Sequence, residues 1–179
     1  MRLTETVLVL AARDSLAAVL VVSAVAKAAD FRGFSRTVSG LLPPLDSQDL
    51  YPLLAGLIIA LEAAVSGLVL SGLWPRLANV ALLSMAAGFT VVSLYGVRFR
   101  PSVACRCFGS LSDSRFGTLS VIRSTALLAL AAALVGIDAH APIAYDAPGW
   151  INVASLVAFG GLGLISAQAA GAIATIRST

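Results

Sequence analysis

The sequence predicts an all-α integral membrane protein, built as a four-helix bundle plus a fifth C-terminal transmembrane helix. Of its 179 residues, 59% are hydrophobic and only 12% are charged, and the mean hydropathy is +0.94. A soluble domain contains about 45–50% apolar and about 25% charged residues, so this composition indicates a protein that faces lipid. Nearly all the basic residues are arginine and alanine is abundant, which is typical of a GC-rich bacterial genome. We therefore expect a multi-pass protein of a bacterial cell (inner) membrane.

Five apolar stretches are long enough to cross a membrane, because a spanning helix needs about 20 apolar residues. They cover residues 7–29, 53–73, 77–97, 119–137 and 151–176. The first four predict a membrane domain at residues 1–137, and residues 138–179 add a loop and the fifth helix. Arg13 and Asp14 split the apolar part of the first stretch, which argues against a cleaved signal peptide.

The fifth stretch carries the glycine-rich segment "FGGLG" at 159–163. Small residues in a membrane helix allow another helix to approach closely, so this segment is a candidate helix–helix contact at Gly160–Gly163. A loosely packed helix weakened by glycine explains the same pattern equally well.

The connections between the spans fall into two groups on opposite sides of the membrane. Residues 30–52 and 98–118 form long loops on one side, and the proline pair in "LLPPLDSQD" at 41–49 disfavours a helix there. Most of the lysine and arginine residues lie on that side, which the positive-inside rule makes cytoplasmic. Disulfides form outside the cytoplasm, so the charge pattern conflicts with an oxidative role for the second loop.

Both cysteines of the chain, Cys105 and Cys107, lie in "SVACRCFGS" at 102–110. A disulfide between residues two positions apart needs a bent backbone, and strained disulfides tend to be labile or catalytic. Arg106 and the arginines nearby favour the reactive thiolate. The loop is thus typical of a reactive dithiol, with incidental small residues or a lipidation site as alternatives. Together with the single histidine, His140, the cysteines are too few ligands for zinc, so we expect no metal.

Glu62 lies near the middle of the second span, where an ionised acid costs about 2.5–3.5 kcal/mol. Such a residue normally faces the bundle interior and has a partner. Arg123 in the fourth span and Lys27 at the end of the first are the candidates, although both side chains could instead reach the interface. Glu62 could serve as a proton relay or as an anchor for a membrane quinone, the one cofactor we consider. The slightly favoured interpretation is a structural ion pair or a protonated, hydrogen-bonded acid that fixes helix packing.

Five features, in this order along the chain, resemble the methylamine utilisation protein MauE family, part of the DoxX-like group of small four-helix membrane proteins. They are "SAVAKAADFRGF" at 23–34, "LLP" at 41–43, Glu62, "CRCFGS" at 105–110 and Arg123. The resemblance covers roughly residues 10–137. It implies a four-helix bundle with a redox loop at one end. It also implies a role beside a thioredoxin-like partner in the maturation of exported, disulfide-bearing enzymes.

The resemblance also implies roles for single residues. Cys105 and Cys107 match the family's cysteine pair, and Phe108 and Gly109 match the residues that follow it. The family commonly has glycine between the cysteines, whereas this chain has Arg106, which would stiffen a disulfide ring. The fold is also reminiscent of the vitamin K epoxide reductase bundle, by analogy alone. Such oxidases use a second, shuttling cysteine pair, so here any shuttle cysteines belong to another protein.

Together these observations predict a membrane thiol–disulfide redox component that assists disulfide formation in exported proteins, in methylamine utilisation or in a more general pathway. Its partner is a thioredoxin-fold protein, and its catalytic residues are Cys105 and Cys107. The supporting residues are Arg106, Phe108, Gly109, Glu62, Arg123 and Lys27. The alternative is a non-catalytic membrane assembly or scaffold subunit with dispensable cysteines. A permease fits less well because the spans hold few charges. The other expected partner is the lipid bilayer. The loop arginines set the orientation of the protein and contact lipid headgroups, so they do not indicate a nucleic-acid partner.

Overall fold

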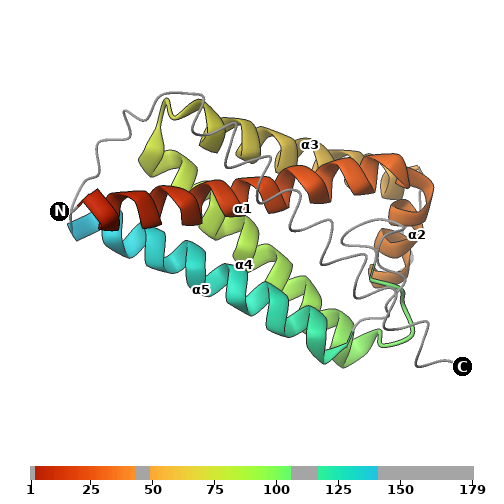
Figure 1. Cartoon of the computed structure of the whole chain (residues 1–179). Coiled ribbons are helices and arrows are strands. Elements are labelled where there is room, and N and C mark those ends of the chain that lie inside the picture. The colour runs from red at the N-terminus through yellow and green to blue at the C-terminus, as the bar shows by residue number, and fades with distance from the viewer. Residues whose placement is uncertain (1–2, 43–48, 106–116, 141–179) are drawn as a thin grey trace, which may run out of the picture.

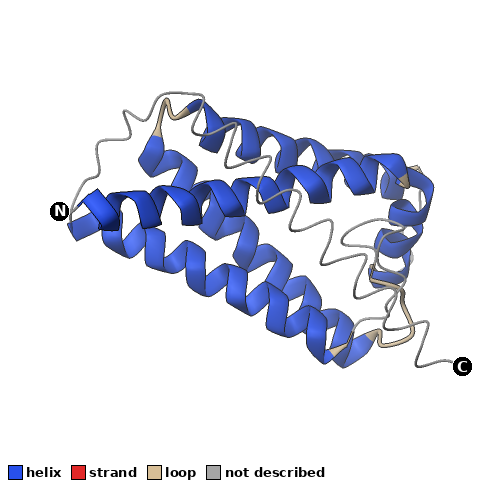
Figure 2. Cartoon of the chain, viewed as in Figure 1, coloured by secondary structure: helices blue, strands red, loops and turns tan. Residues whose placement is uncertain are grey.

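The computed structural model describes residues 3–42, 49–105 and 117–140, which form five α-helices and no β-strand (Figure 1, Figure 2). The helices are α1 (Leu3–Ala29), α2 (Phe31–Leu41), α3 (Leu50–Ser71), α4 (Pro75–Phe99) and α5 (Thr118–His140). Four of these described helices, all but α2, are long and apolar enough to cross a membrane. The predicted all-α membrane fold is confirmed. The expected fifth transmembrane helix at 151–176 lies outside the described residues.

The four long helices coincide with the first four predicted spans to within a few residues at each end. The turn between α3 and α4 shows why the helices end there. Gly72 closes α3 in a left-handed conformation, with a φ of 67°, which glycine adopts without a steric penalty. Pro75 starts α4, at a position where its missing N–H is not needed. This tight turn makes α3 and α4 antiparallel neighbours.

A short helix, α2, occupies part of the segment predicted as a long loop at residues 30–52, so that prediction is wrong for its first half. Asp30 caps the helix, because its Oδ1 accepts a hydrogen bond from the Gly33 backbone N–H at 3.2 Å. Phe34 and Val38, one turn apart, are buried in a small apolar cluster with residues of α3. The proline pair therefore follows the helix rather than preventing it.

The long helices pack as two main pairs, α1 with α3 and α4 with α5, while α2 packs on α3. In Figure 1, α3 and α4 meet at the turn that contains Gly72 and diverge toward the opposite end, where α2 turns across the bundle. The end of α4, the segment 100–105 and the start of α5 lie at this same end. The segments that follow α1 and α4 are therefore on one side, as the sequence predicted.

The main hydrophobic core fills the half of the bundle next to the Gly72 turn. Among its buried residues are Val9, Leu16, Leu20, Val65, Val69, Leu82 and Leu134. Fully buried alanines on three helices, Ala17, Ala78 and Ala131, allow the backbones to approach closely. Arg13, buried in this half, donates from Nη2 to the Val69 carbonyl at 2.6 Å, which places a cation at the negative C-terminal end of α3.

Candidate functional site

A buried ion pair joins α1 to α3 in the other half of the bundle. Lys27 Nζ contacts Glu62 Oε1, and the two side chains are 1% and 0% exposed. Lys27 also donates to Ser23 Oγ, one turn earlier in α1, at 2.7 Å. A charge inside a membrane bundle is tolerable when an opposite charge and hydrogen bonds compensate it. Each residue of the pair therefore explains the presence of the other.

Of the two partners expected for Glu62, the structure selects Lys27. The alternative that Lys27 reaches the interface is wrong, because its side chain is buried and turned toward α3. Arg123 is exposed on α5, so the expectation of an Arg123–Glu62 pair is also wrong. Arg123 lies only a turn and a half into its helix, where a long side chain can reach the membrane surface.

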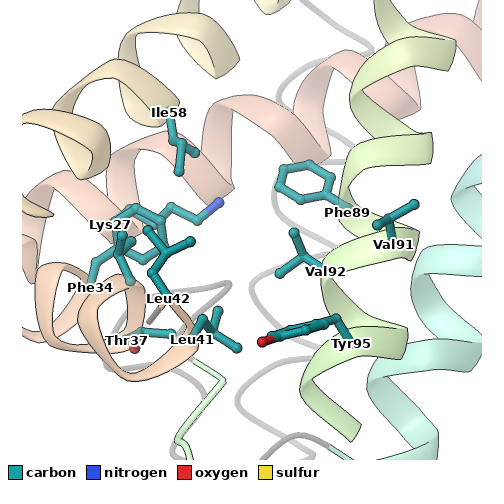
Figure 3. A pocket seen from close by; sticks show the side chains of 11 residues that line it. Lys27, Phe34, Thr37, Leu41, Leu42, Ile58, Phe89, Val91, Val92 and Tyr95 are labelled. Atoms are coloured by element: carbon teal, nitrogen blue, oxygen red, sulfur yellow. The ribbon is translucent and has the colours of Figure 1, made fainter. Parts of the chain in front are cut away.

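Lys27 forms part of the wall of an apolar cavity between α2, α3 and α4 (Figure 3). The volume of this cavity is about 490 Å³. The Lys27 Nζ lies 4.9 Å from the ring centre of Phe89 and 5.3 Å from that of Phe34, within the range of cation–π attraction. The other lining residues are Thr37, Val38, Leu41, Leu42, Ile58, Val91, Val92 and Tyr95. The cavity thus combines aromatic and aliphatic walls with one buried ammonium group.

The segment that leads to the cysteines is fixed to α2 at the same end of the bundle. Thr37 Oγ1 donates to the Ala104 carbonyl at 3.1 Å. A Cβ added at Gly40 would stand 3.1 Å from Val103 Cγ2, so the glycine allows α2 and the segment to approach closely. Cys105, the next residue along, is only 4% exposed. Its sulfur therefore belongs to the packed end of the bundle and not to an open loop.

A serine hydroxyl lies beside the Cys105 sulfur, and further hydroxyl groups follow along the contact between α4 and α5. Cys105 Sγ lies 3.5 Å from Ser120 Oγ at the start of α5, and this oxygen lies 3.4 Å from Ser93 Oγ on α4. One turn earlier in α4, Thr90 Oγ1 donates to the Ser124 carbonyl at 3.1 Å. A serine hydroxyl can donate to a thiolate or accept from a thiol. Ser120 can therefore accompany a change in the charge of the sulfur.

Thr37 links the cavity to the cysteine segment. Its side chain lines the cavity and also donates to the carbonyl of the residue before Cys105. Phe34, one turn earlier on α2, lies beside the Lys27 ammonium. The buried ion pair, the cavity and the cysteine segment therefore share one end of the bundle, and α2 contributes to the surroundings of each.

The other predicted site residues fall outside this description. Arg106, Cys107, Phe108 and Gly109 lie outside the described residues, as do the glycines at 160–163. Of the two cysteines in the predicted dithiol, the structure therefore describes the surroundings of Cys105.

Three hydroxyl residues at this site were missed by the sequence analysis or treated as ordinary. Thr37 belongs to a segment expected to be a loop, although the spacing of Phe34, Thr37 and Val38 is typical of one helix face. Ser93 has no distinguishing sequence signal, because serine is an ordinary hydrogen-bonding residue of membrane helices. Ser120 carries no sequence signal, because its role depends on the start of α5 lying against the end of α4.

The fold and the site together define a class: a multi-pass α-helical membrane protein with a cysteine segment packed at one end of its bundle. Over residues 5–137 the chain matches the family described as methylamine utilisation protein MauE, and it belongs to that family. The family inferred from sequence features is thus confirmed, and the protein is a membrane protein of the methylamine-utilisation type. No curated protein and no solved structure matches the chain.

Proposed function

We propose that this protein is a membrane thiol–disulfide redox component whose cysteines, Cys105 and Cys107, exchange electrons with a thioredoxin-fold partner during the maturation of exported proteins. The observation that carries the proposal is the environment of Cys105. The residue before it is held by Thr37, and its sulfur lies beside the Ser120 hydroxyl at the end of a membrane bundle. The concentration of both cysteines of the chain in this one segment supports the same role.

The proposed exchange starts from a disulfide between Cys105 and Cys107. A thiolate of the reduced partner attacks one sulfur, forms a mixed disulfide and releases the other sulfur, which takes up a proton. The partner's second thiolate then breaks the mixed disulfide, so the partner leaves oxidised and this protein holds two thiols. Two electrons and two protons have moved to this protein. A membrane quinone is the class of acceptor that restores the disulfide as it becomes a quinol.

The burial of Cys105 predicts the order of attack within the pair. Access to the sulfur is one of the factors that set the rate of thiol–disulfide exchange, and Cys105 is 4% exposed. The partner therefore attacks Cys107, and Cys105 leaves as the thiolate. Ser120 Oγ, 3.5 Å from the Cys105 sulfur, is placed to donate a hydrogen bond to that developing charge.

This role requires the cysteine segment to face the exported side of a bacterial inner membrane, although the charge pattern favours the opposite side. One of the charges on that side is buried, because Lys27 pairs with Glu62, and it does not mark a loop. The exposed arginines of α2 and of the end of α4 are available to bind lipid headgroups or an acidic partner surface.

The experiment that tests the proposal is a trap for the mixed disulfide in acid-quenched cells, read on non-reducing gels. In Cys105→Ser, the Cys107 thiolate can still attack the disulfide of the oxidised partner, but Cys105 is no longer present to displace the partner from the mixed disulfide. A reducible adduct should therefore accumulate, which mass spectrometry identifies as a thioredoxin-fold protein. Cys107→Ser should accumulate at least several-fold less. Ser102→Ala, an exposed position in the same segment, is the matched control and should leave exchange unchanged.

The same strains separate the redox role from the scaffold alternative. Under the redox proposal, cells with Cys105→Ser and Cys107→Ser together should fail to mature exported disulfide-bearing enzymes. Normal maturation in that double variant, with no adduct in either single variant, would leave the protein as a non-catalytic assembly subunit.

A further inference from the structure

The cavity between α2, α3 and α4 has the properties of a small-molecule site. Its volume of about 490 Å³ falls within the roughly 300–1,000 Å³ of typical ligand sites, which are mostly apolar with a few placed polar groups. Here the charged group is Lys27, which is 1% exposed. Figure 3 shows its nitrogen directed across the cavity toward Phe89.

The hydrogen bonds of Lys27 leave one donor for a ligand. An ammonium group has three N–H donors, and two of them are used by Glu62 Oε1 and Ser23 Oγ. The remaining donor lies among the Phe34 and Phe89 rings, which offer a π face but no oxygen. An unsatisfied buried donor is costly, so a carbonyl oxygen in the cavity would complete the shell of Lys27.

The walls of the cavity restrict what can occupy it. The rim residues Val91 and Val92 are 65% and 43% exposed on a membrane-spanning helix, so the route into the cavity leads from the lipid. A lipid acyl chain would fill the space but offers no acceptor for Lys27. A flat ring that carries carbonyl oxygens and an apolar tail fits all three features. The ring can pack against the aromatic walls, a carbonyl oxygen can accept from the ammonium group, and the tail can pass through the open rim.

We propose that this cavity binds the head group of a membrane quinone, with Lys27 Nζ donating a hydrogen bond to one quinone carbonyl and the tail leaving past Val91 and Val92. The role of a quinone here rests on the proposed redox function. Thr37 links the two sites, because its side chain lines the cavity and also binds the segment that carries Cys105.

The electron transfer at this site balances without a further reactant. The two thiols of Cys105 and Cys107 lose two electrons and two protons as the S–S bond forms. The quinone gains two electrons and two protons as it becomes the quinol. The disulfide is then ready for the next reduced partner.

The test measures binding of ubiquinone-1, a quinone with one isoprene unit, to the full chain in lipid nanodiscs by isothermal titration calorimetry. The wild-type protein should bind one molecule saturably. Val92→Trp fills the cavity rim and should weaken binding at least tenfold. Val80→Trp makes the same change on the same helix at an exposed position away from the cavity, and should bind like the wild type.

A second variant tests the role assigned to the ammonium group. Lys27→Met together with Glu62→Met removes the donor without leaving a lone buried charge, so the fold should survive, as thermal unfolding can verify. Quinone affinity in this double variant should fall about tenfold or more. Titration of empty nanodiscs measures the background signal from quinone that partitions into the lipid.

The outcomes distinguish the quinone site from the redox function. No saturable binding, or equal binding by Val92→Trp and Val80→Trp, would overturn the site, and so would a tightly held phospholipid found there by native mass spectrometry. The double variant with Cys105→Ser and Cys107→Ser should bind the quinone normally. If the site binds quinone but reduced wild-type protein yields no quinol, the proposed function fails while the site stands.

Discussion

The two halves of this bundle fill their interiors in different ways. Next to the Gly72 turn, buried leucine, valine and alanine residues from all four long helices form one continuous core. At the opposite end, the interior holds the Lys27–Glu62 pair, an apolar cavity and the cysteine segment, with a small cluster around Phe34 and Val38. We refer to these regions as the closed half and the open half.

The two halves differ in how much their packing stabilises the bundle. Close packing stabilises a membrane bundle through van der Waals contacts, since lipid is as apolar as the side chains. A cavity and a buried ion pair give up part of that stabilisation. The closed half therefore holds the long helices together. The open half contains the cavity and supports the segment that leads to Cys105.

The largest effect should come from breaking the ion pair of the open half. Lys27→Met leaves the Glu62 carboxylate buried without its counter-charge, which should destabilise the protein by about 3–5 kcal/mol. Replacing both residues with methionine should recover most of that loss, because an apolar pair of similar volume is often as stable. Thermal unfolding in mild detergent measures all three proteins. A double variant as unstable as the single one would show that the two charges do not balance each other.

A smaller effect should distinguish the packing of the two halves. Leu82, buried in the core of the closed half, should lose about 2–5 kcal/mol when changed to alanine, as in other well-packed cores. Leu41 lines the cavity and is partly exposed, so Leu41→Ala should cost less than about 1 kcal/mol. The same unfolding assay compares them, and equal losses would contradict the division into a closed and an open half.

The smallest change in stability, with a specific effect on the cysteine, is expected for Thr37→Val. This variant removes the hydrogen bond to the Ala104 carbonyl, worth about 1 kcal/mol, so the segment should open more often. Alkylation of Cys105 by a maleimide, measured in the Cys107→Ser background, should speed up about fivefold. Ser39→Ala, on the same helix with a local bond to the Arg36 carbonyl, should leave the rate unchanged. Equal rates in both variants would show that Thr37 does not restrain the segment.

The long helices could be predicted from the sequence because their apolar composition alone determines them. The charged residues inside them did not hide the signal, since the stretches that contain Arg13, Lys27 and Glu62 are apolar over most of their length. The short helix α2 was harder to predict. Arginine, serine and glycine make its average composition polar, and its helical character lies in the spacing of Phe34 and Val38.

The candidate site was predicted in part. The sequence could place Glu62 in a span and offer two cations for it, but the choice of Lys27 depends on how α1 packs on α3. The cavity could not be predicted, because its walls combine side chains of α1, α2, α3 and α4 that are far apart in the sequence. The contact of Cys105 with Ser120 joins residues on either side of a loop, and spacing along the chain gives no information about it.

The most direct test of the redox account is a gel-shift of intact cells with a membrane-impermeant maleimide, with and without prior treatment by an impermeant reductant. The chain has two cysteines, so each band reports on this pair, and the variant with serine at 105 and 107 controls for background. We predict that the maleimide labels this protein only after external reduction, as expected for an outward-facing disulfide. Labelling only after cell lysis would place the cysteines inside, in agreement with the charge pattern, and would contradict the oxidative role.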